Sequence, residues 1–373
     1  MKNKIYKYDF LVVGAGLIGS LAALQLIKKN YSVLIIDKNK QLINDNRTLA
    51  VNANSRDFLI KLGLWSKLKS KPESIKKIII KDNINNFPLV FENVDEEMGS
   101  VIYNNELLKE SRKALKKRKF LLEEVSIPIE NFISNKKISI KNKNYIFKNI
   151  VLCLGKKFNN KNIVNKFLFP TNHNSFVGFF NHSYSHNQAA YEIFTKDGPL
   201  AVLPSPDKSK KKSTFIYSTK KNISNLGLHN LLNKHFKVTH GKINLINGTK
   251  NFELLPHLSL EKSNKYILIG DSLRSIHPVA GQGWNLGIKD IQTLTDILDI
   301  YDLGDSNFIK KYYQHRKIES FTYLSFTSIL NIFYENQNPI SNVFIKTGFS
   351  ILKNFDFLRN TFIKQAMGRT KLI

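Results

Sequence analysis

The stretch YILIGDSLRSIHPVAGQGWNLGIKD, residues 266–290, decides how the rest of this chain is interpreted. Residues 266–269 form an apolar run with the length and branching of a buried strand, which a glycine and Asp271 end abruptly. Residues 278–283 supply fixed and permissive backbone angles, and residues 284–298 then alternate apolar and polar side chains at helical spacing. The stretch therefore predicts a strand, an acidic turn, a glycine loop and a helix.

This order of elements indicates a particular kind of ligand. A carboxylate placed directly after a strand, as Asp271 is, can accept hydrogen bonds from a polyol. The backbone N–H groups of Gly281, Gln282 and Gly283 would point at an electron-rich group above the helix start. A cofactor with both a sugar alcohol and a reducible ring would fit.

The amino-terminal segment predicts a βαβ unit. A short apolar strand over residues 8–13 leads into GAGLIG, residues 14–19, and a helix over residues 20–29. A second strand over residues 32–36 ends on Asp37. A carboxylate at this offset from the glycine motif is typical of dinucleotide-binding domains.

Each motif residue has a physical role in such a unit. Gly14 allows the tight turn, Gly16 lets the backbone approach a pyrophosphate, and Gly19 lets the helix meet the strand. Asp37 can accept a hydrogen bond from an adenosine ribose hydroxyl. The alternative is a glycine-rich turn that merely packs, and the motif alone does not distinguish NAD from FAD.

A basic residue follows the second strand. Arg47 enters a stretch of small residues, and a helix is expected from about residue 55 to residue 62. The planar donor fork of Arg47 could reach the pyrophosphate or the flavin edge, and the alternative is an ordinary surface arginine.

Composition excludes several classes of protein. The chain has 373 residues, of which 42% are hydrophobic and 11% aromatic, so it is a globular protein and not a disordered one. The formal net charge is +28, from 57 Lys and Arg against 29 Asp and Glu. Because the lysines are scattered, we expect no nucleic-acid partner.

The sequence also bears on the compartment. Cys153, the single cysteine, allows no intrachain disulfide and no thiolate zinc site, which suits a reducing cytosol. No apolar run approaches the ~20 residues that span a bilayer, and the chain begins with a polar lead and a strand. We expect a cytoplasmic protein, with peripheral contact on the inner face of the membrane as the alternative.

The patterns along the chain predict two packed domains. We expect the dinucleotide domain to be assembled from residues 1–74, 98–165 and 252–310, the β-sheet domain from residues 75–97 and 166–251, and a helical region from residues 311–373. The predicted class is α/β, with a doubly wound, Rossmann-like domain, an interposed sheet domain that covers the cofactor, and carboxy-terminal helices.

The sheet domain contains three nearby histidines, His173, His182 and His186, which are candidate ligands of a metal ion. No carboxylate or thiol accompanies them at ligand spacing, and ordinary polar residues are the better interpretation.

The carboxy-terminal region predicts helices over residues 308–334, 340–355 and 357–367, rich in Phe, Ile and Leu with interspersed Lys and Arg. A helical cap on the core is the simpler interpretation. The alternative is that part of this surface rests on a membrane face to receive a lipid substrate.

Taken together, the motifs resemble the flavin-dependent aromatic hydroxylases, and specifically the ubiquinone-biosynthesis hydroxylases. The resemblance runs nearly end to end. Its segments are GAGLIG with Asp37, RTLAVNANSRDFLIKLGLW, MGSVIYNNELL, SHNQAAYEIFTKDGPLAVLP, LIGDSLRSIHPVAGQGWNLGIKD, and the tail from YYQHR to QAMG. HPVAGQGWNLG and KDGPLAVLP are the most specific, since other glycine-rich nucleotide folds do not pair them.

The resemblance implies a set of FAD contacts. The ADP half would be held by Gly14, Gly16, Gly19 and Asp37, Arg47 would lie near the pyrophosphate or the ring, and Asn104 would be a further cofactor contact. The ribityl chain would be bound by Asp271, and the isoalloxazine would be faced by Pro278, Gly281, Gln282, Gly283 and Asn285. It further implies hydride transfer from NAD(P)H to FAD, reaction with O₂ to a flavin hydroperoxide, and hydroxylation of an activated polyprenyl phenol. No acid–base triad is required and none is visible.

Two departures from the family pattern stand out. The family's Ala-Asp-Gly, followed by Ser and Arg, is here Cys153-Leu154-Gly155-Lys156-Lys157, so the acid linked to both cofactors is missing. The family's Gly-Asp-Ala-Ala-His is here residues 270–274, which keep the acid but end on Arg274. Fast sequence divergence is one explanation of both departures, and altered reduction of the flavin is the other.

Two rival functions remain open from the sequence. One is another FAD reaction on the same scaffold, such as reduction or halogenation. The other is a non-catalytic flavin-binding or flavin-free subunit of a quinone-biosynthesis complex, which loss of the acidic loop would suit and the intact glycine motif argues against.

Overall fold

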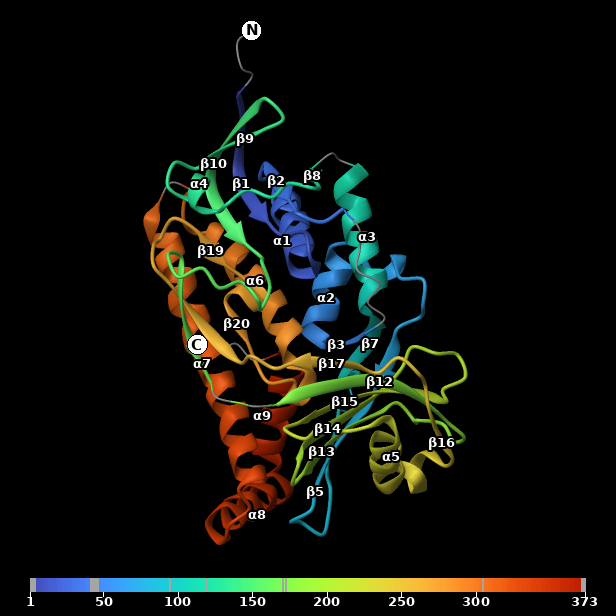
Figure 1. Ribbon diagram of the computed structural model, residues 1–373. Helices are drawn as coiled ribbons and strands as arrows, with labels where there is room; N and C mark the ends of the chain where they lie inside the picture. Colours follow the sequence, from blue (N-terminus) through green and yellow to red (C-terminus); the bar gives the residue numbers. More distant parts are fainter. Residues whose placement is uncertain are drawn as a thin grey trace.

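A parallel sheet forms the centre of the part of the chain that carries GAGLIG (Figure 1, upper half). The computed structural model describes residues 5–40, 47–93, 95–117, 120–169, 171, 173–303 and 305–369. Within them the sheet has the order β8 (Leu121–Leu122), β2 (Val33–Ile36), β1 (Ile5–Val13), β10 (Lys143–Leu152) and β19 (Ile267–Leu268), with β9 (Lys137–Ile140) antiparallel to β10. The five ordered strands pair in parallel, so their carboxyl ends lie at one edge.

The strands of this sheet are apolar because helices cover it. Every residue of β2 is buried, and so are the last four of β1 and of β10. Helix α1 (Leu17–Lys28) contacts both α3 (Asn104–Lys117) and α6 (Gln282–Leu298). The predicted doubly wound core is confirmed.

A second, larger sheet forms the lower half of Figure 1. Its order is β16 (Ile243–Leu245), β12 (Asn174–His182), β15 (Lys212–Thr219), β14 (Gly198–Pro204), β13 (Ala189–Thr195), β5 (Lys77–Asp82) and β6 (Leu89–Glu92), with β17 (Lys250–Glu253) also paired to β12. Only β13 and β5 pair in parallel among these strands of the described chain. Segments far apart in sequence thus form one sheet.

Two short sheets complete the strands. One contains β3 (Thr48–Asn52), β7 (Gly99–Tyr103) and β4 (Glu73–Ile75), and the other β11 (Val164–Leu168), β18 (His257–Glu261) and β20 (Arg274–Ser275). Short helices connect other parts of the chain: α2 (Ala53–Lys61), η1 (Trp65–Lys67), α4 (Glu130–Ile133), η2 (Gly270–Ser272) and η3 (Val279–Gly281).

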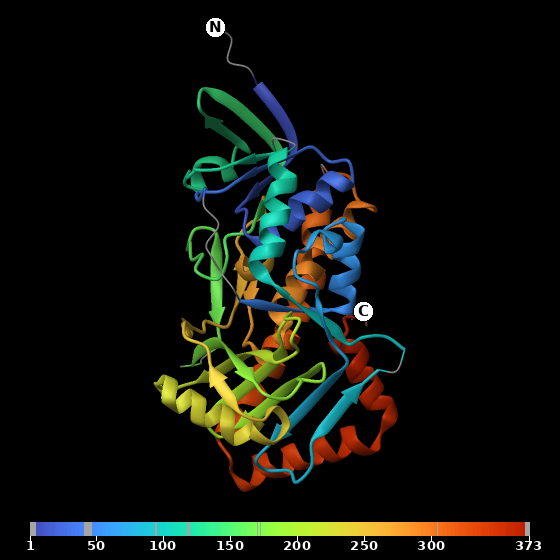
Figure 2. The same ribbon diagram turned by 90° about the vertical axis from the view of Figure 1, so that its right-hand side faces the viewer.

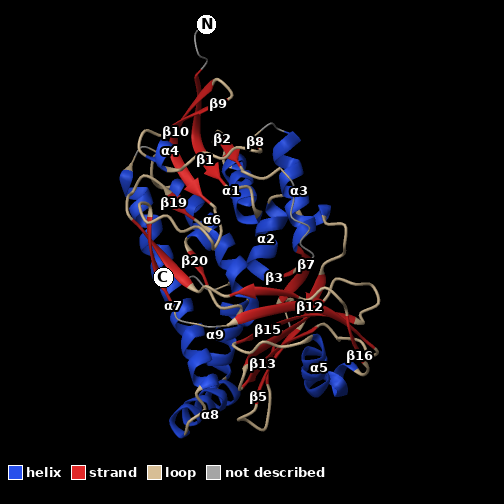
Figure 3. Cartoon of the chain, viewed as in Figure 1, coloured by secondary structure: helices blue, strands red, loops and turns tan. Residues whose placement is uncertain are grey.

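The carboxy-terminal helices run along one side of the molecule and across its lower end (Figures 1 and 3). They are α7 (Ser306–Glu335), α8 (Pro339–Asn354) and α9 (Asp356–Ala366), which nearly match the predicted ranges. The Asn338 side chain caps α8 and Pro339 occupies its first turn, which explains the sharp start. No helix in the described part of the chain is both long and apolar enough to cross a membrane.

One element was missed by the sequence interpretation. Residues 167–251 contain the expected strands, but α5 (Asn225–His240) interrupts them and lies against the larger sheet (Figure 2, yellow). The signs were present, because Ser224 caps Gly227 N–H and Leu228, Leu232 and Phe236 recur at helical spacing on the buried face.

Candidate functional site

The loop between β1 and α1 is closed by backbone contacts that only glycine permits. Gly14 has φ +101°, and its N–H donates to the Ile36 carbonyl at 2.8 Å. A Cβ on Gly14 would lie 2.4 Å from the Cys153 carbonyl oxygen, and one on Gly19 would lie 1.9 Å from the Gly14 carbonyl oxygen. The tight turn and the close helix approach predicted for these two glycines are therefore present.

Gly16 differs from its neighbours. A Cβ on Gly16 would meet no described atom within 4 Å, although the residue is the amino-terminal cap of α1. No side chain caps this helix, so its first N–H groups face the space above Gly16. A phosphate group bound there would meet both the N–H groups and the positive end of the helix dipole.

Asp37 lies at the adjoining strand end, where it also holds the loop together. Its carboxylate accepts from Ala15 N–H at 2.6 Å and from Asn39 N–H at 2.7 Å. Arg112 of α3 donates to the Ala15 carbonyl at 3.1 Å and forms an ion pair with Glu123 at 2.5 Å. Arg112 was missed in the sequence because its partners come from three separate segments.

Asp271 lies just beyond β19, at the same edge of the sheet. Gly270 has φ +60°, which turns the chain, and its N–H donates to Asp290 at 2.8 Å. Asp271 is solvent-exposed, yet desolvation raises its pKa, with Lys156, Arg274 and Arg47 acting in the opposite direction. The carboxylate is thus accessible but closely surrounded by protein, as a group that contacts a ligand would be.

Arg47 and Asn104 adjoin each other. Asn104 N–H donates to the Arg47 carbonyl at 2.9 Å, which joins the start of α3 to the start of β3. The Arg47 guanidinium stacks on the Phe252 ring, 4.8 Å from its centroid. Arg47 also acts on the pKa of Asp271, so the predicted ADP-side and flavin-side residues share one electrostatic environment.

The turn from Pro278 to Gly281 leads into α6. Gly281 has φ +60° and caps the helix without any side-chain hydrogen bond. The Asn285 amide donates to the Ala50 carbonyl at 3.0 Å and accepts from Asn52 N–H at 3.1 Å. The Asn285 side chain therefore links β3 to α6. The first backbone N–H groups of α6, which include those of Gln282 and Gly283, receive no side-chain cap.

These features fit FAD. The chain provides two helix starts without side-chain caps, an open position at Gly16 and an accessible carboxylate at Asp271. A pyrophosphate would fit at Gly16 and the start of α1, and a ribityl chain would fit beside Asp271. The electron-rich edge of an isoalloxazine would fit at the start of α6. The assignment of each residue to a part of FAD remains a prediction.

The structure explains the two positions, Leu154 and Arg274, at which the sequence departs from the family pattern. Leu154 takes the place of the family's acid and packs against the core, while its N–H donates to Ser272 Oγ at 2.5 Å. Arg274 points inward and pairs with Asp290 through two bonds of 2.8 and 3.0 Å. Arg316 also donates to Asp290, at 2.7 Å, so Arg274 has become part of a buried ion network.

The histidines hold no metal site within the described residues, since no group of three potential ligands is found there. His182 bonds instead to the Tyr184 carbonyl and to Ser213 Oγ. From the sequence, His173 is only a candidate metal ligand, but in the structure it lies between His277 and Glu335 in a buried hydrogen-bond chain. No local pattern shows this, because the three residues come from different segments.

Comparison with known proteins shows what the chain is similar to. Residues 7–117 match the family model of the FAD binding domain, and residues 233–362 match that of squalene epoxidase. The fold is that of p-nitrophenol 4-monooxygenase PnpA from Pseudomonas putida DLL-E4, with a TM-score of 0.75 and 14% identity over 99% of this chain and 100% of that one. The chain therefore shares its fold with a monooxygenase, and its residues 7–117 are similar to an FAD binding domain.

Several of its sequence relatives are named ubiquinone hydroxylases or ubiquinone biosynthesis monooxygenases. Ubiquinone hydroxylase UbiL of Rhodospirillum rubrum is 23% identical over 98% of this chain and 90% of the relative. Ubiquinone biosynthesis monooxygenase COQ6 of Caenorhabditis elegans is 24% identical, with 91% of each chain covered. The resemblance inferred from the motifs is confirmed.

Proposed function

We propose that this protein hydroxylates the aromatic ring of a polyprenyl phenol in ubiquinone biosynthesis, with FAD as its cofactor and O₂ as co-substrate. The end-to-end similarity to ubiquinone hydroxylases is the observation that carries the proposal. The FAD-binding features described above support it, because the glycine motif and the Asp271 turn lie at one sheet edge.

In this proposal FAD supplies electron transfer and the activation of O₂. The start of α1 would bind the pyrophosphate, and Asp271 would orient the ribityl chain. The amino-terminal N–H groups of α6 would stabilise negative charge on the reduced ring. The fold would contribute binding, orientation and exclusion of water.

The electron donor is proposed to be NAD(P)H. Leu154 replaces the acidic residue that the family links to both cofactors, so this step is the one most affected by divergence. Anaerobic addition of NADH or NADPH to the FAD-loaded protein should bleach the visible flavin absorbance. A flavin that dithionite reduces but neither nucleotide reduces would require a different donor.

The hydroxylation itself is tested with a 2-polyprenylphenol in detergent, FAD, NAD(P)H and O₂. The expected product is heavier by one oxygen atom, and ¹⁸O₂ should supply that atom. NAD(P)H oxidation that yields only hydrogen peroxide would indicate another substrate. A brominated or chlorinated product in the presence of halide would establish the halogenase alternative.

We further propose that α8 and α9 contact an anionic membrane surface. One face of α8 is buried through Ile345 and Phe349, while Ile340, Val343 and Phe344 are each more than half exposed. Apolar side chains on the outer face of a helix suggest a surface that something covers. α8 lies at the lower end of the molecule in Figure 1, below the larger sheet.

Charge favours a lipid surface as the occupant. Residues 339–366 contain four basic residues, Lys346, Lys353, Arg359 and Lys364, and one acidic residue, Asp356. Basic residues around an amphipathic surface attract anionic headgroups. Contact with the bilayer would allow the protein to receive a polyprenyl substrate directly from the membrane.

Sedimentation with vesicles tests this contact. Phosphatidylglycerol vesicles should carry the protein down, and phosphatidylcholine vesicles should carry less. Phe344→Ser should reduce binding, whereas Val238→Ser, at an apolar residue 90% exposed on α5, should not. Equal binding by both variants would place the contact elsewhere, and a partner protein of a quinone-biosynthesis complex would then be sought for this face.

A further inference from the structure

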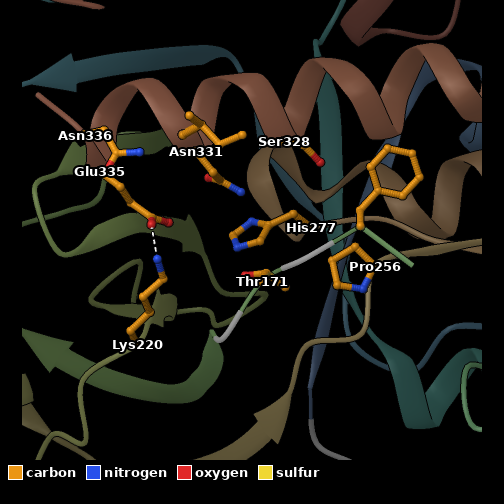
Figure 4. A pocket seen from close by; sticks show the side chains of 10 residues that line it. Thr171, Lys220, Pro256, His277, Ser328, Asn331, Glu335 and Asn336 are labelled. Carbon is orange, nitrogen blue, oxygen red and sulfur yellow. Dashed lines mark hydrogen bonds and ion pairs between the residues drawn. The ribbon is translucent and has the colours of Figure 1, made fainter. Parts of the chain in front are cut away.

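A polar pocket of about 130 Å³ lies beneath α7. Figure 4 shows Ser328, Asn331 and Glu335 coming from that helix, and Lys220 meeting Glu335 from the opposite side. His277 lines the pocket and directly precedes Pro278, where the turn proposed to face the flavin begins. The other lining residues are Phe169, Thr171, Pro256, Ile332 and Asn336.

Hydrogen bonds fix the orientation of both imidazoles in this region. His173 Nε2 lies 2.7 Å from a Glu335 carboxylate oxygen, and His173 Nδ1 lies 3.1 Å from His277 Nε2. A carboxylate can only accept, so His173 Nε2 carries its proton and His173 Nδ1 is an acceptor. His277 Nε2–H must then donate, which leaves the lone pair on His277 Nδ1.

That lone pair has no partner among the described residues. His277 is only 2% exposed, so an unmade hydrogen bond there is costly. Asn331 Oδ1, in a side chain that is nine-tenths buried, also lacks a partner within the described chain. His277 and Asn331 therefore both line this pocket, and each has a buried acceptor atom without a donor among the described residues.

The electrostatics keep the imidazoles neutral. Burial lowers the pKa of His277 to about 3, and His173 adds to the effect. Burial also lowers the pKa of His173, against the opposing influence of Glu335. A neutral pair of this kind can pass a proton by exchanging tautomers, without either ring becoming a cation.

We propose that this pocket receives the hydroxyl group of a phenolic ligand, which donates to His277 Nδ1, and that His277 and His173 carry its proton to Glu335. The inference rests on the proposed function for its choice of a phenol as substrate. An aromatic ring suits the space, because an engineered cavity of about 150 Å³ holds benzene.

The transfer balances atom by atom. The phenol O–H proton moves to His277 Nδ1 while the His277 Nε2 proton moves to His173 Nδ1. The His173 Nε2 proton then moves to Glu335, so a phenol and a carboxylate become a phenolate and a carboxylic acid. Lys220 is ion-paired to the second Glu335 oxygen and is about half exposed, which connects the chain to solvent. A phenolate ring is more electron-rich and better prepared for oxygen transfer.

The test uses ring nitrogen NMR of the full chain with FAD, with phenol and anisole as the probes. Anisole has the same ring without a donor. In the free protein His277 should show a protonated Nε2 and a bare Nδ1, and phenol should shift Nδ1 whereas anisole should not. Protonated Nδ1 in the free protein, equal shifts from both probes, or no shift from either would overturn the proposal.

Variants add an affinity readout. Phenol should bind roughly fivefold to tenfold more tightly than anisole, the effect of one hydrogen bond. His277→Leu should abolish this preference, and His315→Gln, at an exposed residue on α7, should keep it. If His277→Leu does not fold, Glu335→Gln provides the test. A glutamine side chain no longer requires a proton on His173 Nε2, so both imidazoles can adopt the other tautomer. A protonated His277 Nδ1 should then appear, and the preference for phenol over anisole should fall.

Both variants retaining the full preference would overturn the proposal. The readouts do not depend on turnover. A protein that fails to hydroxylate any polyprenyl phenol but still shows the phenol-specific shift would contradict the proposed function and leave this site in place.

Discussion

The glycines of the β1–α1 loop illustrate how residues of one type have different roles. Gly19→Ala would place a Cβ 1.9 Å from the Gly14 carbonyl oxygen, where backbone must move. We expect a loss of stability of about 1–3 kcal/mol or more. Gly16→Ala meets no described atom within 4 Å, so we expect stability within about 1 kcal/mol of wild type but weaker FAD binding.

Urea unfolding without FAD and a fluorescence titration with FAD separate these effects. Gly348→Ala, at an open position on α8, is the control that should change neither quantity by much. A Gly16→Ala protein that binds FAD as tightly as wild type would show that no phosphate approaches this residue.

Asp271 is the second test at the scale of one residue. Asp271 is exposed, and the charges of Lys156, Arg274 and Arg47 act to lower the pKa of its carboxyl group. We propose that this carboxylate accepts hydrogen bonds from the ribityl hydroxyl groups. Asp271→Ala should remain folded and bind FAD roughly 10- to 100-fold more weakly, from the loss of a hydrogen bond to a charged group. Asp299→Ala, at an exposed residue paired with Lys29, is the matched control. Wild-type affinity in Asp271→Ala would refute the assignment.

Local chemistry explains which of these residues could be predicted. Gly14 and Gly19 were predictable because a turn and a helix crossing impose their own local requirements. Arg112 and the contacts of Asn285 were not, since their partners are brought in by the packing of β2, β3 and α3. Sequence spacing carries no record of such contacts.

At the scale of elements, a buried ion network joins α6, α7 and β20 and holds the turn at Asp271 in place. Asp290 accepts from Arg274, Arg316 and Gly270 N–H, and its side chain is fully buried. Arg274→Ala would leave a buried carboxylate short of one partner. We expect a loss of about 3–5 kcal/mol in the free energy of unfolding, measured by urea denaturation.

Arg359→Ala serves as the comparison for that variant. It removes a pair with Asp356 that is mostly exposed, and a change within about 0.5 kcal/mol is expected. Equal effects of the two substitutions would mean that the buried network contributes no special stability.

Elements were predictable to different degrees. The carboxy-terminal helices were anticipated almost to the residue, because their apolar spacing is long and side chains cap the starts of α7 and α8. Helix α5 was missed because it lies in a region dominated by strands, although its own buried spacing is helical. The order of strands could not be deduced, because β5 and β13 pair across a long stretch of chain.

At the scale of the whole molecule, buried histidines predict acid sensitivity. Burial lowers the pKa of His186 and His257 to about 4, and that of His240 and His277 to about 3. The unfolded chain takes up these protons near pH 6.5, so it binds more protons than the folded chain between about pH 4 and 6.5. Stability should be greatest above pH 6.5 and fall as the pH is lowered.

The slope should be up to about 1.4 kcal/mol per pH unit for each of these histidines. Urea unfolding at pH 7 and pH 5 measures it directly. Equal free energies of unfolding at pH 7 and pH 5 would show that these rings take up their protons over the same pH range in the folded and the unfolded chain.

Binding of FAD is the measurement that tests the central claim most directly. Purified protein is titrated with FAD, and the visible spectrum of the protein fraction is recorded after gel filtration. We predict that one flavin per chain stays with wild type and that Gly16→Ala and Asp271→Ala retain less. A folded wild-type protein that leaves the column without flavin at saturating FAD would contradict the account.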